Sequence, residues 1–187
     1  MNWSRIARRV RVPLGFLLAV FYLWIARPAL WSIFAGSAIA VLGLAIRALA
    51  SGTIRKNEEL AMSGLYAYTR NPLYLGSILL SAGFAVAARS WIVVVVLAVM
   101  FFVIYLPVIR GEEQFLRERF PEFTEYERRV PRLIPPPIPR TGPTLIGKQP
   151  SGSFSRALYM QHREYNALLG TIAMLAALTV KLFWFSR

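Results

Sequence analysis

The run SWIVVVVLAVMFFVIYLPVI occupies residues 90–109 and carries no charge between Arg89 and Arg110. At about 1.5 Å of rise per residue, such a helix is about 30 Å long, which matches the hydrocarbon core of a bilayer. Four other stretches, of 15, 19, 18 and 16 residues, also lack charged residues. The sequence therefore predicts an all-α, polytopic integral membrane protein.

We expect about five transmembrane helices in a single integral membrane domain, residues 1–187, with spans at about 12–26, 28–48, 72–88, 90–109 and 165–185. The first and last uncharged stretches are short, and flanking basic side chains that reach toward the headgroups lengthen such helices. Tryptophans lie near the predicted span ends, as in an interfacial aromatic belt, at Trp3, Trp24, Trp31, Trp91 and Trp184.

Composition excludes several classes of function. The chain has no cysteine and one histidine, His162, which argues against a metal centre and against a serine–histidine triad. Its net charge of +13 lies between apolar stretches. Membrane topology and anionic headgroups explain this charge better than nucleic acid does. We therefore expect membrane lipids as partners, with no nucleic acid and no metal.

The basic residues predict the orientation in the membrane. With five spans and the N-terminus inside, 18 of the 22 lysines and arginines face one side, together with all nine acids. The positive-inside rule then places the N-terminus in the cytoplasm and the C-terminus outside a plasma or inner membrane. A second span follows residues 12–26 at once, so we interpret this first stretch as a retained anchor.

The longer connections fall on the predicted cytoplasmic side. Residues 111–130 form an amphipathic pattern, in which Pro121 is expected to begin a second short helix. Residues 131–150 form a proline-rich cytoplasmic strap, and an amphipathic turn at about 155–163 leads into the last span. Residues 131–163 act either as a lid over a cofactor or as a surface tether. The sequence leaves both possibilities open.

Four glycines recur at separations of seven within the second and third spans, at Gly36, Gly43, Gly76 and Gly83. Small residues allow membrane helices to approach closely, so we expect these two spans to pack at the glycines.

Polar residues gather in two catalytic segments, 64–76 and 110–135. Residues 64–76 read GLYAYTRNPLYLG, and they are followed after one further span by Glu112 and Glu113, then by Tyr126 and by VPRLIP at 130–135. This order resembles the signature of the isoprenylcysteine carboxyl methyltransferase and phospholipid methyltransferase families of integral membrane methyltransferases. The resemblance covers about two-fifths of the chain. Asn71 departs from it, because many relatives carry histidine there.

The resemblance implies S-adenosylmethionine as cofactor and methyl transfer at the cytoplasmic membrane face. The acceptor would be lipidic or membrane-partitioned, either a carboxylate of the isoprenylcysteine type or a lipid amine. The residues expected to bind the cofactor are Gly64, Tyr66, Tyr68, Arg70, Asn71, Pro72, Tyr74, Glu112, Glu113, Tyr126 and Arg132. Glu113, Arg132 and Asn71 are the expected catalytic residues.

The chemistry of these residues fits that cofactor. Arginines hold carboxylates, glutamates accept hydrogen bonds from ribose hydroxyls or an ammonium, and tyrosine faces attract a sulfonium by about 0.5–2 kcal/mol. A carboxylate acceptor needs positioning alone, whereas an amine needs a base such as Glu113 or Glu112. Asn71 cannot titrate near neutral pH, which leaves it an orienting or capping role.

Two other classes of function remain. A membrane reductase of the steroid reductase type would use NADPH, but its relatives usually place an acid where this chain has Leu75 and Gly76. In a non-enzymatic membrane scaffold, the tyrosines and arginines would only bind headgroups. Binding of S-adenosylhomocysteine or of NADPH distinguishes the three.

Overall fold

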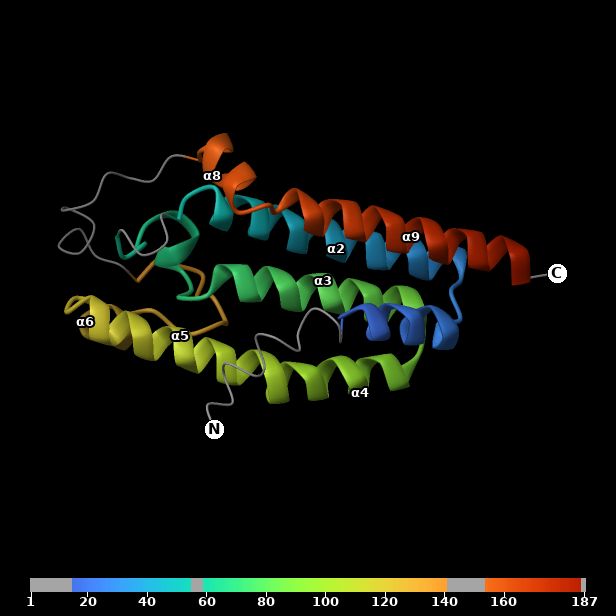
Figure 1. Cartoon of the computed structure of the whole chain (residues 1–187), viewed down its shortest axis with the longest axis horizontal. Helices are drawn as coiled ribbons and strands as arrows, with labels where there is room; N and C mark the ends of the chain where they lie inside the picture. Colours follow the sequence, from blue (N-terminus) through green and yellow to red (C-terminus); the bar gives the residue numbers. More distant parts are fainter. Residues whose placement is uncertain (1–14, 55–58, 141–153, 186–187) are drawn as a thin grey trace. The chain divides into compact units, whose positions relative to one another are not determined.

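The computed structural model describes residues 15–54, 59–140 and 154–185, and these residues form helices joined by turns, without a strand. The all-α prediction is therefore confirmed (Figure 1). The helices are Gly15–Ile25, α2 (Leu30–Ser51), the 3-10 turn η1 (Gly64–Ala67), α3 (Pro72–Ala88), α4 (Trp91–Met100), the π-helix η2 (Phe101–Tyr105), α5 (Leu106–Arg119), α6 (Phe123–Arg129), α8 (Arg156–Gln161) and α9 (Tyr165–Phe185).

Three of these helical segments are long and apolar enough to cross a membrane: Leu30–Ser51, Trp91–Arg119 and Tyr165–Trp184. Two shorter apolar helices, Gly15–Ile25 and Pro72–Ala88, lie within the other two predicted spans. The chain is thus an integral membrane protein, as predicted. The crossing of the two shorter helices stays a prediction.

The segment Trp91–Arg119 is a continuous run of 29 helical residues in which the hydrogen-bonding pattern changes near the centre. Its centre, Phe101–Tyr105, is a π-helix. Pro107 lies two residues further on and has no N–H to donate to the carbonyl four residues earlier, which is one cause of such local rearrangement. Each π turn holds one residue more than an α turn. The side chains of α5 therefore point in directions rotated from those that an unbroken α-helix would give them.

Contacts divide the chain into two compact units. The first contains the described residues up to Val41, Leu79–Glu113 and the chain from Leu169 onward. Its core consists of Tyr22, Ala26, Ala87, Ala88, Val93 and Leu178. The Tyr22 hydroxyl donates to the Phe84 carbonyl at 2.8 Å. This bond ties the first helix to α3.

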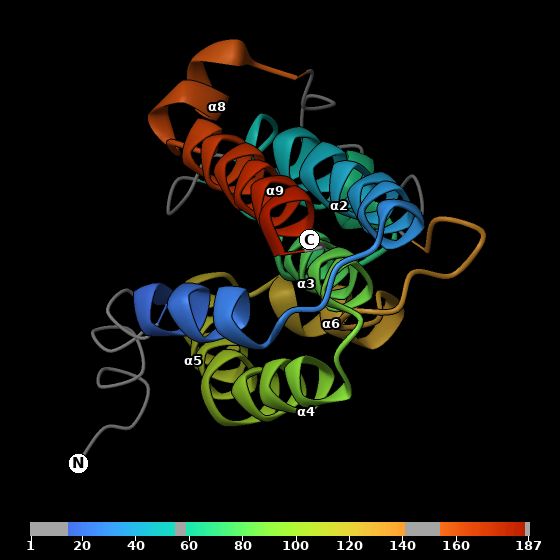
Figure 2. The same cartoon turned by 90° about the vertical axis from the view of Figure 1, so that its right-hand side faces the viewer.

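The glycine prediction is confirmed. In the first unit, a Cβ on Gly83 would lie 2.6 Å from the carbonyl oxygen of Gly36. In the second unit, a Cβ on Gly76 would lie 2.7 Å from the carbonyl oxygen of Gly43 and 2.6 Å from Cγ of Arg47. Within each unit α2 therefore runs against α3 at glycine, and the two helices lie side by side in both views (Figure 1, Figure 2).

The second unit comprises Leu42–Ile78 and the described residues from Gln114 to Leu168. Its core contains Leu60, Met62, Phe123, Tyr126 and Val130. The short helix expected after Pro121 is present as α6, which begins two residues later, at Phe123. The turn expected near residues 155–163 is also helical, as α8, and Ser155 caps it by accepting from the Leu158 N–H.

The chain that leads into α9 is fastened to the end of α2 within the second unit. The Ser155 N–H donates to the Gly52 carbonyl at 2.8 Å, and Nδ1 of His162 lies 3.0 Å from the Ser51 carbonyl. Glu164 accepts from Nε and Nη2 of Arg47 at 2.8–3.0 Å. Arg47 also donates to Ser77 on α3. The polar ends of α2, α3 and α9 are therefore linked through one arginine.

Candidate active site

The first catalytic segment begins with a turn that requires glycine. Gly64 has φ +60°, a left-handed backbone conformation that L side chains rarely adopt. The 3-10 turn η1 follows, and Pro72 then opens α3, at a first helical position where proline needs no N–H partner. The spacing of Gly64 and Pro72 thus specifies a turn that leads into a membrane helix.

Four hydrogen bonds join this turn to the strap, and in one of them the Arg140 N–H donates to the Ala67 carbonyl at 3.1 Å. Arg70 donates its N–H to the Pro131 carbonyl at 2.9 Å. The carbonyl of Arg132 accepts both from the Thr69 hydroxyl, at 3.0 Å, and from the side-chain amide of Asn71, at 3.2 Å. The amide of Asn71 therefore holds the backbone of another predicted site residue. The orienting role of Asn71 toward a cofactor stays a prediction.

Tyr126 is buried against the turn. Its side chain is 1% exposed and its hydroxyl donates to the Tyr66 carbonyl at 2.7 Å. Its ring meets Phe123 edge to face, with centroids 6.0 Å apart. The side chain of Tyr66 is itself buried. Both tyrosines therefore have a structural role beside the turn. Tyr68, by contrast, is half-buried and lies at the end of η1.

Arg70 takes part in a charge cluster. Its Nη1 donates to Glu127 at 3.2 Å, and its guanidinium lies over the Phe123 ring, 5.9 Å from the centroid. Arg117 donates to both carboxylate oxygens of Glu127, at 3.1 and 2.8 Å. Chiefly because of the Arg117 hydrogen bonds, the pKa of Glu127 lies below that of an ordinary glutamate; burial opposes the shift, and the charges of Arg117 and Arg70 add to it. Glu127 is therefore ionised at neutral pH, and the three charges sum to one positive charge.

A cavity of about 460 Å³ adjoins this turn. Its volume falls in the range of small-molecule sites, about 300–1,000 Å³. The lining side chains are uncharged and mostly apolar, and they come from α2, the turn, α3 and the strap: Ile46, Leu65, Tyr68, Thr69, Pro72, Leu75, Pro135 and Pro136. The sequence pattern thus brings Tyr68 and Pro72 to a cavity that the strap prolines help to enclose.

The two adjacent glutamates on α5 have different surroundings. Glu113 is 3% exposed, whereas Glu112 is exposed. Glu113 shares its face of the helix with Leu116 and Phe120, three and seven residues further on. Both of these pack against the Phe123 and Tyr126 core. Glu112 and Glu113 are the last residues of Leu79–Glu113 and belong to the first unit.

The structure thus brings most of the predicted cofactor-binding residues into one unit: Gly64, Tyr66, Tyr68, Arg70, Asn71, Pro72, Tyr74, Tyr126 and Arg132. Tyr74 is half-buried on α3, and Arg132 is half-buried in the strap. Sequence reasoning did not single out Thr69, Arg117, Glu127 or Phe123. Thr69 lies inside the quoted signature, but a threonine gives no signal by type. Among the described strap residues, Ile134 and Ile138 are exposed, and residues 141–153 lie outside the described part.

These features define an integral membrane protein in which a polar turn is hydrogen-bonded to a proline-rich strap within the second unit. The chain belongs to the phospholipid methyltransferase family, whose model matches residues 10–122. It is 44% identical over 81 residues to the cobalt-zinc-cadmium resistance protein CzcN of Cupriavidus metallidurans and 37% identical over 81 residues to the nickel-cobalt-cadmium resistance protein NccN of Alcaligenes xylosoxydans xylosoxydans. Each match covers 43% of this chain and 38% of the relative. No solved structure matches the chain.

Proposed function

We propose that this protein transfers a methyl group from S-adenosylmethionine to a lipidic or membrane-partitioned acceptor. The observation that carries the proposal is the turn at residues 64–72, which the strap fastens beside a cavity of about 460 Å³. Membership in the phospholipid methyltransferase family supports the class of reaction. An activated methyl on a sulfonium is the chemistry that this cofactor supplies when bound.

Different residues of this chain would bind different parts of the cofactor. The uncharged walls of the cavity, with Tyr68 and Pro72, suit an adenosine group. Because no charged side chain lines this cavity, the amino acid end of the cofactor would need groups outside it. Arg132 would bind the carboxylate, and Glu113 would accept from ribose hydroxyls or from the ammonium. Asn71 keeps the Arg132 backbone in place.

Catalysis then consists mainly of alignment and exclusion of water. The apolar cavity walls keep water from the reacting atoms. With a carboxylate acceptor, an arginine positions the nucleophile and no proton moves. With an amine acceptor, a carboxylate oxygen of Glu113 takes the proton before transfer. Asn71 serves as base in neither case, because an amide does not titrate near neutral pH.

Ligand titration of purified full-length protein tests the cofactor. We expect S-adenosylhomocysteine to bind with a micromolar dissociation constant, about −8 kcal/mol, and NADPH to show no binding by calorimetry. Absence of S-adenosylhomocysteine binding to well-folded protein would refute the methyltransferase proposal. Saturable NADPH binding in its place would favour the reductase.

The proposed orientation places the N-terminus in the cytoplasm and the C-terminus outside, because 18 basic residues then face inward and four outward. A phosphatase fused after Arg187 should be active outside the cytoplasm, and a matched fusion within residues 141–153 should be inactive. A cytoplasmic C-terminus would contradict the five-span topology. It would mean that the short first helix does not cross.

The metals in the names of the two relatives are not carried over to this chain, which spans 38% of the length of each. Among the described residues, no group of three or more histidine, cysteine, aspartate or glutamate side chains is placed to hold a metal ion. The proposal therefore rests on the turn, the strap and the family.

A further inference from the structure

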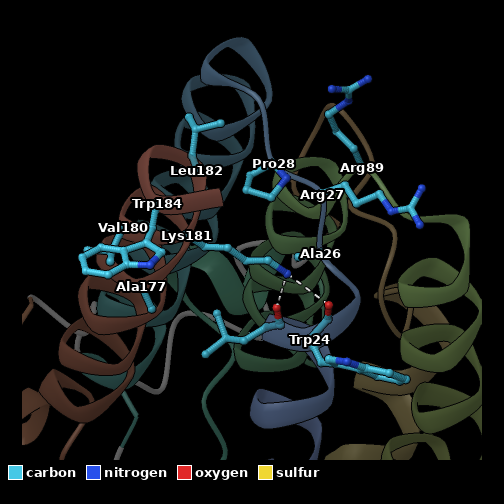
Figure 3. A pocket seen from close by; sticks show the side chains of 11 residues that line it. Trp24, Ala26, Arg27, Pro28, Arg89, Ala177, Val180, Lys181, Leu182 and Trp184 are labelled. Atoms are coloured by element: carbon cyan, nitrogen blue, oxygen red, sulfur yellow. Dashed lines mark hydrogen bonds between the residues drawn. The ribbon is translucent and has the colours of Figure 1, made fainter. Parts of the chain in front are cut away.

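A larger cavity, of about 990 Å³, lies within the first unit, and none of its lining residues belongs to the candidate active site (Figure 3). The end of the first helix, the connection to α2, the connection between α3 and α4, and the last turns of α9 line it. Three cationic side chains stand among its walls: Arg27, Arg89 and Lys181. The remaining lining residues are apolar or aromatic.

Lys181 is fixed by the backbone of the first helix. Its Nζ donates to the carbonyls of Leu23 and Trp24 at 2.5 and 3.1 Å, and Figure 3 shows its side chain reaching across from α9. The carbonyls at the end of a helix carry partial negative charge, which a cation stabilises. Lys181 therefore lines one side of the cavity, with its ammonium held at the end of the first helix.

The two arginines are exposed, and a backbone hydrogen bond joins Arg27 to the residue before Arg89. Arg27 donates its N–H to the Ala88 carbonyl at 2.8 Å, which joins the two connections. Arg89 has φ +50°, an uncommon conformation for a residue with a side chain, and its guanidinium lies 5.5 Å from the centroid of Trp31. The fold thus accepts local backbone strain while it places a second guanidinium at this cavity.

Nothing in the nearby sequence neutralises these charges. The nine acids of the chain lie between residues 58 and 127 and at Glu164. In the first unit the acids are Glu112 and Glu113, and about 30 Å of continuous helix separates them from Trp91, next to this cavity. Three like charges around an apolar recess produce a positive potential that attracts an anion.

The surroundings favour the anion of a lipid. Trp24 and Trp184 line the cavity and are 77% and 76% exposed. Exposed tryptophans lie at the headgroup level of bilayers, where ring and N–H meet different environments. Val180 and Phe183 extend an exposed apolar surface along α9, which suits acyl chains. A free phosphate would use the cations but none of this apolar surface.

We propose that this cavity binds the phosphodiester of an anionic phospholipid, with the forks of Arg27 and Arg89 on its oxygens, Lys181 as a fixed charge and the tryptophans beside the glycerol region. The bound lipid would bridge the first helix, α3 and α9. The proposal is independent of the methyl-transfer site, since it involves neither the turn nor the strap.

Titration of the full-length protein in detergent with phosphatidylglycerol and with phosphatidylcholine tests this site. We expect the anionic lipid to bind at least about tenfold more tightly, because arginine forks match phosphate oxygens and the zwitterionic headgroup carries its own cation. The double variant Arg27→Gln, Arg89→Gln should lose this preference. Arg27→Lys, Arg89→Lys keeps the charge and should retain an intermediate preference.

Two controls decide the interpretation. The double variant Arg119→Gln, Arg128→Gln removes the same charge from exposed positions of α5 and α6 and should keep the preference. Equal loss in both double variants would reduce the effect to net charge and overturn the site. Equal binding of the two lipids by the wild type would overturn it too. Competition by millimolar inorganic phosphate would assign the cavity to a free anion and overturn the lipid.

Discussion

Methyl transfer should fall about ten- to hundredfold in Glu113→Gln and stay within about twofold of the wild type in Glu112→Gln. The two residues are adjacent and chemically identical, but Glu113 is 3% exposed and Glu112 is exposed. Loss of one hydrogen bond to a charged group costs about 1.5–3 kcal/mol, which gives the expected factor. The measurement is transfer of a labelled methyl group from S-adenosylmethionine into membrane lipids, together with the dissociation constant of S-adenosylhomocysteine.

The exposed neighbour serves as the control for charge and for position on α5. Similar losses in both variants, or no loss in Glu113→Gln, would remove Glu113 from the site. The pH profile then separates two roles. If Glu113 takes a proton from an amine, the acidic limb of the profile disappears in Glu113→Gln. If it only binds the cofactor, the limb persists and the binding constant changes.

Gly83→Ala should destabilise the protein by about 1–3 kcal/mol, the usual cost of overpacking a tight contact. The added Cβ would lie 2.6 Å from the Gly36 carbonyl oxygen and 2.8 Å from the Ala40 nitrogen, and backbone atoms cannot turn aside as a side chain can. The measurement is the midpoint of thermal unfolding in detergent, followed by size-exclusion chromatography.

Gly170→Ala provides the matched control, because a Cβ at Gly170 on α9 meets nothing within 4 Å. There the better helix propensity of alanine should leave stability unchanged or raise it by up to about 1 kcal/mol. A thermal midpoint of Gly83→Ala at or above that of Gly170→Ala would show that α2 and α3 do not depend on the close approach at Gly36.

The helices could be predicted from sequence because a bilayer imposes a strict rule: charges leave the hydrocarbon core, so charged residues mark the ends of helices. The recurrence of Gly36, Gly43, Gly76 and Gly83 also predicted close helix packing at these positions, since small residues permit such contacts. Local signals were similarly reliable. Pro72 opens α3, and α6 follows Pro121.

The partners inside the site could not be predicted in the same way. Six glutamates lie between residues 112 and 127, and no pattern says which of them meets Arg70. The answer, Glu127, depends on how α6 folds back after α5. The partner of Thr69 could not be predicted either, because its hydrogen bond to the Arg132 carbonyl joins positions 63 residues apart. Side-chain type suggested which residues of this segment could bind a cofactor, but the fold of the turn and the strap determines which side chains pair.

The π-helix at Phe101–Tyr105 also affects which sequence changes this helix can tolerate during evolution. Conversion of this π turn to an α turn, with the number of residues unchanged, would rotate everything after it by about 100°, the angle between neighbours on a helix. Glu112 would then take the inward direction that Glu113 has now. Two consecutive glutamates therefore keep a carboxylate in the inward direction whether this turn is π or α. A related protein in which the π turn had become an α turn would still place an acid in this direction, namely the residue at position 112.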